Sequence, residues 1–385
     1  MKHHLRRYVV TITVALSWLP MAAQLYETGY YRIRNVGYPT HYISIANDKL
    51  DYGTVISNAG GGLSALMSSA GQSRALACAG LYLQTDIHLE EDANCMNPAT
   101  IIYLKFSSGS KYDLIAQSTS LTKITTGEYS GTIALKFKDI YASIIRRSGS
   151  GADSKYTASV ELKASNYSLA NLGTRYFVDN NGTFAISESY TSDNAKWYIE
   201  QLTSFNVNAT VEYKGKYYCT MYTPFAYKLS GQTLAAYVIS GNADGTVVKT
   251  CIATNENGAA VPAGTPVILE CGSNVPANCQ LIPQGEPRID DTSDYTGTNL
   301  LKGAYFCNTD GSLTYQTSKG TGSFSANNYT SYNASTMLVF GKSEDPAGVE
   351  RLGFFKYTGD EMKSNKVWLD ISNSANGSLT FDPEN

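Results

Sequence analysis

The chain has 385 residues, a formal net charge of −3 and 16% charged residues, with 29 tyrosines and 33 glycines. The absence of a basic excess disfavours nucleic acid as a partner, and 43% hydrophobic residues are too many for a disordered tail. Tyr, Thr, Val and Ile favour strands while Gly, Asn and Asp supply turns, so the composition indicates a mostly β protein.

The first 23 residues have the layout of a secretory signal peptide. Lys2, Arg6 and Arg7 give a positive start, Tyr8–Leu19 is apolar, and small residues lead to Gln24. We therefore expect export to the cell surface or the medium, with cleavage near Gln24. The apolar run is too short for a comfortable membrane span and no second long one follows, so we expect no span in the mature chain.

A β pattern begins directly after the leader. Residues 31–36 alternate between apolar and polar side chains, and a Gly-Tyr-Pro turn follows. A similar phrase then starts at His41, Lys111 and Arg175: a basic residue or His, an aromatic, apolar residues and a polar turn. Three such phrases predict a three-part β architecture, and their uneven spacing requires insertions.

Two segments depart from the strand pattern. Residues 58–91 form one predicted insertion, with short helices over 63–67 and 74–78. Over residues 133–147 the early part alternates as a strand does, and the later part is spaced as a helix.

The third phrase leads on to a strand around Trp197. The Tyr-Tyr-Arg-Ile-Arg-Asn opening from Tyr30 and the Ala-Lys-Trp-Tyr-Ile-Glu segment from Ala195 resemble a β-trefoil of the ricin-lectin type, over Tyr26–Leu202. The resemblance implies a β-trefoil-like domain with insertions over residues 24–204. The Gln-x-Trp phrase of that family's sugar site is absent here, so the resemblance transfers no lectin residue.

The second half is again rich in short strands, which predicts a β-sandwich over residues 205–385. The phrases Thr-Pro-Phe-Ala from Thr223, Val-Pro-Ala-Gly-Thr-Pro from Val261 and Gly-Phe-Phe-Lys-Tyr from Gly353 stand in this order. They resemble a C-terminal β domain that recurs in secreted surface proteins of Gram-negative anaerobic bacteria. The resemblance implies an accessory or surface module and supplies no catalytic residue.

Seven cysteines make an odd count, so at least one thiol stays free or pairs with another chain. The nearest neighbours in sequence, Cys78 with Cys95 and Cys271 with Cys279, are the candidate disulfides, and buried thiols are the alternative. The chain has no C-x-x-C motif, which leaves a zinc ribbon or a redox motif without support.

The sequence offers few histidines that could act as the base for a catalytic nucleophile. Once the leader is removed only His41 and His88 remain. We read His41 as a polar strand edge and His88 as part of a solvated acidic loop, with a metal site as the minor alternative. The sequence contains no Gly-x-Ser-x-Gly elbow, no His-Glu-x-x-His and no P-loop.

Carboxylates offer the remaining route to chemistry. Asp290, Asp291 and Asp294, and also Glu344 with Asp345, lie among turn-forming residues. Paired acids of this kind could serve a glycoside hydrolase or bind calcium, but solvated turns explain them better. We expect no catalytic residue, no metal and no cofactor.

These observations favour a non-enzymatic binding or adhesion protein whose partner is a glycan or host surface polymer. Tyrosines in polar contexts could stack on sugar rings; they are Tyr167, Tyr190, Tyr295, Tyr315, Tyr329 and Tyr332. The alternatives are a structural component that pairs with a surface-complex protein, a carboxylate-dependent glycoside hydrolase, and a protease inhibitor.

Overall fold

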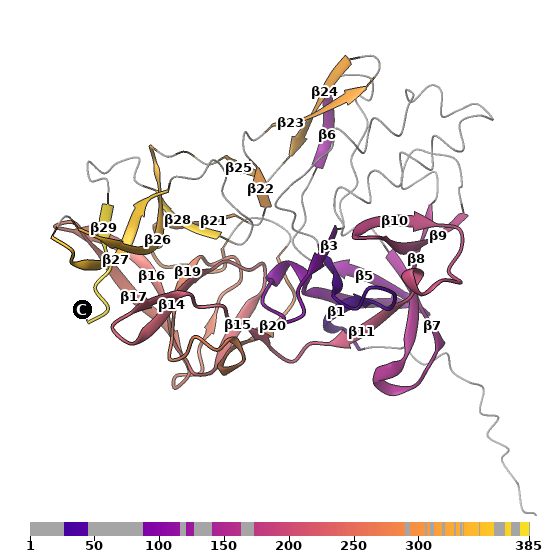
Figure 1. Cartoon of the computed structure of the whole chain (residues 1–385), viewed down its shortest axis with the longest axis horizontal. Helices are drawn as coiled ribbons and strands as arrows, with labels where there is room; N and C mark the ends of the chain where they lie inside the picture. The colour runs from indigo at the N-terminus through magenta and orange to yellow at the C-terminus, as the bar shows by residue number, and fades with distance from the viewer. Residues whose placement is uncertain are drawn as a thin grey trace, which may run out of the picture.

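The architecture is built almost wholly from strands (Figure 1). This computed structural model describes residues 27–44, 88–115, 121–126, 141–162, 173–288, 293–304, 306–308, 312–317, 320–326, 329–331, 333, 335–345, 347–357, 366–370 and 378–384. Helix within those ranges is limited to three-residue 3-10 turns: η2 (Pro98–Thr100), η4 (Gly151–Asp153), η5 (Asp193–Ala195) and η6 (Pro276–Asn278). The mostly β prediction is confirmed.

Six antiparallel strands of the first half close into a barrel. Around the barrel they are β1 (Gly29–Asn35), β4 (Ile102–Ser108), β5 (Lys111–Ile115), β7 (Tyr141–Ser148), β8 (Lys155–Leu162) and β11 (Trp197–Gln201). Closure comes from β11, which pairs with both β1 and β8. Two hairpins extend from this ring: β2 (His41–Ser44) with β3 (His88–Glu91), and β9 (Gly173–Asn180) with β10 (Thr183–Ser187).

Large side chains fill the barrel. Tyr31, Ile33 and Trp197 are fully or almost fully buried. The indole Nε1 of Trp197 donates to the carbonyl oxygen of Phe177 at 3.1 Å, which satisfies the polar atom of a buried ring. The segment around Trp197 thus anchors the closing strand in the barrel core.

The three similar phrases all lie in strands, but these strands are not equivalent. His41 and Arg175 lie in β2 and β9, the first strands of the two hairpins, whereas Lys111 begins the barrel strand β5. A short phrase of aromatic and apolar residues fits either position, because both need one buried face.

The predicted helix in the later part of residues 133–147 is wrong. Residues 141–148 form β7, which pairs with β5 and β8. Ala142 and Ile144 are buried in alternation with exposed Ile145, so the period is two. β-branched residues side by side favour a strand, and pairing on both sides fixes it. The helices predicted over 63–67 and 74–78 lie outside the described residues.

The second half contributes two main sheets. A ten-stranded sheet runs in the order β13 (Val211–Tyr213), β14 (Lys216–Met221), β19 (Val267–Cys271), β16 (Thr233–Ala243), β17 (Thr246–Thr254), β29 (Ser378–Thr380), β27 (Glu350–Lys356), β26 (Met337–Glu344), β28 (Lys366–Asp370) and β21 (Leu301–Ala304). A four-stranded sheet has the order β12 (Phe205–Asn206), β20 (Cys279–Gln284), β15 (Ala226–Gly231) and β18 (Ala260–Val261).

Two small sheets complete the described strands. β22 (Phe306–Asn308) pairs with β25 (Tyr329–Ser331), and β23 (Ser312–Thr317) pairs with β24 (Gly320–Ala326). β24 also pairs with β6 (Leu121–Thr126), which links the two halves of the chain. The division into residues 24–204 and 205–385 stays a prediction; the barrel sheet spans residues 29–201, and β12 starts at Phe205.

One hydrophobic core is shared by the two halves. Tyr30 of β1 packs edge-on against Phe225, with ring centroids 5.2 Å apart, and its hydroxyl donates to the carbonyl oxygen of Gly285 at 2.8 Å. A second core lies within the ten-stranded sheet around Tyr218, Phe354 and Phe381. The barrel and the four-stranded sheet therefore pack directly against each other.

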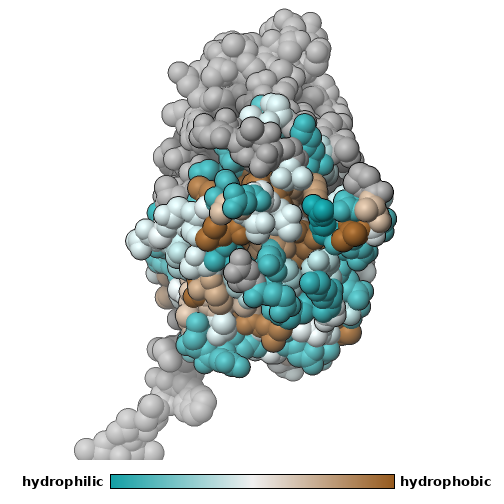
Figure 2. Space-filling view, turned by 90° about the vertical axis from the view of Figure 1, so that its left-hand side faces the viewer, coloured by the Kyte–Doolittle hydropathy of each residue, from teal (hydrophilic) through white to brown (hydrophobic). Residues whose placement is uncertain are grey.

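The outer surface at the end of the molecule formed by the second half is mixed. Figure 2 shows small hydrophobic areas interrupted by hydrophilic side chains. Single exposed apolar residues such as Val248 and Val349 contribute to the surface and are normal for a folded domain. Among the described residues, we find no helix with the length and apolar character needed to cross a bilayer.

Candidate functional site

One hollow on the barrel lies along its closing seam. Its volume is about 430 Å³, and β1, β11 and η4 surround it. The lining residues are Arg34, Ala152, Asp153, Tyr198, Ile199, Glu200 and Gln201. The hollow exists because the first and last strands of the barrel meet here.

Strand register positions the central side chains. Arg34 lies directly opposite Tyr198 in the antiparallel pair of β1 and β11. Tyr198 and Glu200 are two residues apart and share one face of β11, while Ile199 between them is buried on the other. The pairing of β1 with β11 thus brings Arg34 beside Tyr198 and Glu200, which share the polar face of β11.

Arg34 connects the other two. Its guanidinium carbon lies 4.5 Å from the centroid of the Tyr198 ring, and its Nε donates to Glu200 Oε1 at 2.6 Å. Both members of the ion pair are partly exposed. One hydrogen bond holds the guanidinium over the ring, and its remaining N–H groups can serve a ligand.

The rim adds hydrogen-bonding groups of both kinds. Asp153 and Gln201 are exposed, supplying a carboxylate and an amide. An aromatic ring beside a planar cation, two carboxylates and an amide matches what a polyhydroxylated ligand needs: an apolar platform and several donors and acceptors. In the described part of the chain, no group of three or more His, Cys, Asp or Glu residues is arranged to hold a metal ion.

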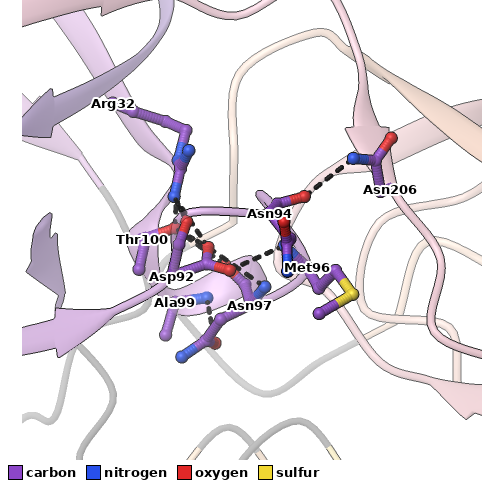
Figure 3. A network of polar contacts seen from close by, with 8 residues as sticks. All are labelled: Arg32, Asp92, Asn94, Met96, Asn97, Ala99, Thr100 and Asn206. Atoms are coloured by element: carbon purple, nitrogen blue, oxygen red, sulfur yellow. Dashed lines mark hydrogen bonds and ion pairs between the residues drawn. The ribbon is translucent and has the colours of Figure 1, made fainter. Parts of the chain in front are cut away.

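A buried ion pair lies on the same strand, two residues before Arg34 (Figure 3). Arg32 contacts Asp92 Oδ2 at 2.9 Å, and both side chains are about 5% exposed. The Asp92 carboxylate also accepts hydrogen bonds from the Thr100 hydroxyl at 2.8 Å and from the backbone amides of Met96, at 2.8 Å, and Asn97, at 3.2 Å.

This network fixes residues 92–100 against β1. The same loop reaches the second half of the chain, because the Asn206 side chain donates to the carbonyl oxygen of Asn94 at 2.7 Å. Both carboxylate oxygens of Asp92 accept hydrogen bonds from within the protein, and the pair is buried, so it acts as a structural support.

His41 does not mark a strand edge as expected. It begins β2, which lies between β1 and β3, and its Nδ1 is 2.6 Å from Oδ2 of the buried Asp179. Asp179 Oδ1 accepts from the Gly182 amide at 2.7 Å, and the His41 ring stacks on Tyr38. His41 thus ties one hairpin to the other.

His88 begins β3, and its side chain lies outside the described residues. Among the described residues, the acidic clusters predicted from the sequence do not form a site. Asp290 and Asp291 lie outside the described residues, and Asp294 pairs with Arg288. Asp345 closes the turn between β26 and β27: it accepts from the amides of Ala347, at 2.9 Å, and Val349, at 3.0 Å.

Arg351 also contacts Asp345, at 2.8 Å. These contacts, with the Val349 amide first, lower the pKa of the Asp345 carboxyl. Its neighbour Glu344 ends β26 and is exposed.

The loop tyrosines that the structure describes do not converge. Tyr190 lies under the Arg147 guanidinium at 4.1 Å and packs against Tyr176. Tyr295 packs against the core shared by the two halves. The side chains of Tyr167, Tyr315, Tyr329 and Tyr332 lie outside the described residues. Tyr198, which lines the hollow, stands in a strand and escaped a search restricted to polar loops.

Sequence reasoning recognised both strands of the hollow but not its residues. The sequence predicted the strands that begin near Tyr30 and Trp197. Arg34, Tyr198 and Glu200 could have been noticed because each falls at a position of its strand whose side chain points outward. Their pairing follows only from barrel closure, which no local pattern reveals.

The candidate disulfides stay predictions. Cys78 lies outside the described residues, so its pairing with Cys95 cannot be followed. Cys95, Cys271 and Cys279 are free thiols in this structure. Burial raises the pKa of Cys95 to about 11.

Comparisons with known proteins give no family. No family model and no curated protein matches the chain. One solved structure that it matches is described as "Structure and mode of action of a mosquitocidal holotoxin", with 12% identity and a TM-score of 0.24. The match covers 93% of this chain and 33% of the other, so the chain spans about a third of the length of that structure. At this level the likeness carries no argument about function.

Proposed function

We propose that the protein is an exported, non-enzymatic binding protein whose barrel recognises a glycan through the Arg34–Tyr198–Glu200 hollow. Export is inferred from the leader over residues 1–23. The observation that carries the ligand class is the juxtaposition of the Tyr198 ring, the Arg34 guanidinium and the Glu200 carboxylate on one exposed face. Sugars present apolar C–H faces and hydroxyl edges, and these groups meet both needs.

The architecture supports the domain assignment that accompanies this proposal. A six-stranded antiparallel barrel with hairpins β2–β3 and β9–β10 fits a decorated β-trefoil over residues 24–204. The four-stranded and ten-stranded sheets that enclose apolar cores fit a β-sandwich over residues 205–385. Both assignments agree with the family resemblances of the sequence and are part of the proposal.

Binding is favoured over hydrolysis by the state of the acids. Glu200 is bonded to Arg34 at 2.6 Å, and both Asp153 and Gln201 are exposed to solvent. A glycosidase needs one acid in a water-poor setting that favours its protonated form. The partly exposed, paired carboxylate of Glu200 lacks that setting.

The proposal is tested by glycan-array screening of the chain from Gln24 onward, followed by calorimetry with the best ligand, mucin or polysaccharide. Tyr198→Ala removes the stacking surface and should weaken binding about tenfold. Tyr190→Ala is the matched control, since it removes a partly buried tyrosine that stacks on an arginine outside the hollow. Failure of the wild-type protein to bind any glycan, or equal affinity in Tyr198→Ala, would overturn the proposal.

A further inference from the structure

Three cysteines from different strands meet inside the second half of the chain. Cys219 lies in β14, Cys271 ends β19 and Cys279 begins β20. Cys271 and Cys279 are fully or almost fully buried, and Cys219 packs against the same core from a partly exposed position. All three are free thiols in this structure.

Strand pairing places Cys271 and Cys279 close to the same turn. Cys271 lies opposite Thr233 of β16 and Cys279 lies opposite Gly231 of β15, two residues earlier, while Cys219 packs against the hydrophobic cluster that holds both. The Cys279 Sγ additionally contacts the carbonyl oxygen of Ser273 at 3.4 Å. Because one sulfur forms one disulfide at a time, Cys271 can pair with Cys219 or with Cys279, and the third thiol then stays reduced.

Strand register disfavours the pair between Cys219 and Cys271. On the β14–β19 ladder Cys219 lies opposite Leu269, and Cys271 lies opposite Tyr217, so the two cysteines are diagonal neighbours. Diagonal neighbours in an antiparallel pair are typically about 7–8 Å apart. A disulfide spans Cα atoms up to about 7 Å apart, so this bridge would require the ladder to move.

The pair between Cys271 and Cys279 is placed more favourably. The two residues flank the short connection from β19 to β20 that contains η6. The Gly272 amide donates to the carbonyl oxygen of Gln232, and the Gln232 amide donates to that of Asn278. One residue of the β15–β16 turn thus clamps both ends of the connection, directly beside the two cysteines.

We propose that Cys271 and Cys279 form a disulfide when the protein meets an oxidising thiol buffer, with Cys219 left as the free thiol. The bond would join β19 of the ten-stranded sheet to β20 of the four-stranded sheet. With oxidised glutathione as oxidant, one cysteine attacks the glutathione disulfide and releases one reduced glutathione. The second cysteine then attacks the mixed disulfide and releases another; the two thiol protons end on the glutathione leaving groups.

The surroundings explain why the bond would be structural rather than catalytic. The neighbouring Cys219 thiol, together with burial, raises the pKa of Cys271 far above its usual range, and burial raises the pKa of Cys279. A thiol that resists ionisation reacts slowly with external disulfides. We therefore expect the bond to form during folding or local opening and then to persist.

The experiment refolds the chain from Gln24 onward in a glutathione redox buffer and, in parallel, with excess reductant. Free thiols are alkylated and the protein is mapped by peptide mass spectrometry. The expected map has Cys271 and Cys279 protected from alkylation in the oxidised sample and Cys219 alkylated. A nine-residue loop predicts a rise in the melting temperature of about 5–10 °C over the reduced sample.

Cys279→Ser should abolish the protection of Cys271 and the difference between oxidised and reduced samples, whereas the matched Cys219→Ser should retain both. The map of the wild-type protein decides the matter even if a variant does not fold. Alkylation of both Cys271 and Cys279 in the oxidised protein, or a bond from Cys219 to Cys271, would overturn the proposal.

Discussion

Replacing Asp92 by Asn tests how much the buried network supports the barrel. The change preserves shape but removes the counter-charge of Arg32, which is about 95% buried. The two carboxylate oxygens accept from Arg32, Thr100 and the amides of Met96 and Asn97. An amide group cannot accept at both positions, so one donor must also lose its partner.

Leaving one partner of a buried ion pair uncompensated costs about 3–5 kcal/mol in the free energy of unfolding. For a domain of this size each kcal/mol shifts the melting temperature by about 2–4 °C, so Asp92→Asn should melt roughly 10 °C below the wild type. Calorimetry and urea unfolding measure the change directly.

The matched control is Asp193→Asn, the same substitution in the exposed pair with Lys196. It should leave the melting temperature within experimental error, because solvent already screens this pair. If Asp92→Asn and Asp193→Asn behaved alike, burial could not be the source of the difference and the role given to the network would be wrong.

Two further changes probe the second half. Gly353→Ala would place a Cβ against the backbone carbonyl of Leu379 in the adjacent strand. Overpacking of this kind lowers the free energy of unfolding by about 1–3 kcal/mol, and the amide of Leu379 should exchange faster. An unchanged melting temperature would contradict the close packing of these two strands. For Asp345 the folded-state pKa lies below the ordinary 3.8, so its stabilisation is present above about pH 4 and is lost as pH falls through the folded value. Protection of the Val349 amide should vanish over that acid range in the wild type, but show no such pH dependence in Asp345→Asn.

Much of the fold could be read from local pattern, and its failures have identifiable causes. Alternation found the strands that hold Arg34 and Tyr198, since each buries one face. The same rule failed at residues 141–148, where neighbouring isoleucines fit two periods and pairing with β5 and β8 decided between them. Local periodicity is strong evidence for an element and weak evidence for its type when apolar residues adjoin.

The candidate site was less predictable because its residues are far apart in sequence. Attention to loop tyrosines missed Tyr198, whose ring is available only because it lies at the outer face of a barrel strand. The acidic clusters were candidates because several carboxylates lie close together in the sequence. Asp345, however, accepts hydrogen bonds from its own turn. Density of a residue type in sequence thus located turns, whereas convergence of types in space located the hollow.

Both sites proposed for this chain arise where segments that are separated in the sequence meet in space. Barrel closure sets β1 beside β11, so Arg34 meets a tyrosine and a glutamate more than 160 residues later. The turn from β15 to β16 carries the chain from the four-stranded to the ten-stranded sheet, and Cys271 and Cys279 lie beside it. Tyr198→Ala should therefore weaken ligand binding without affecting the Cys271–Cys279 bond, because Tyr198 lies outside the hydrophobic core that contains both cysteines.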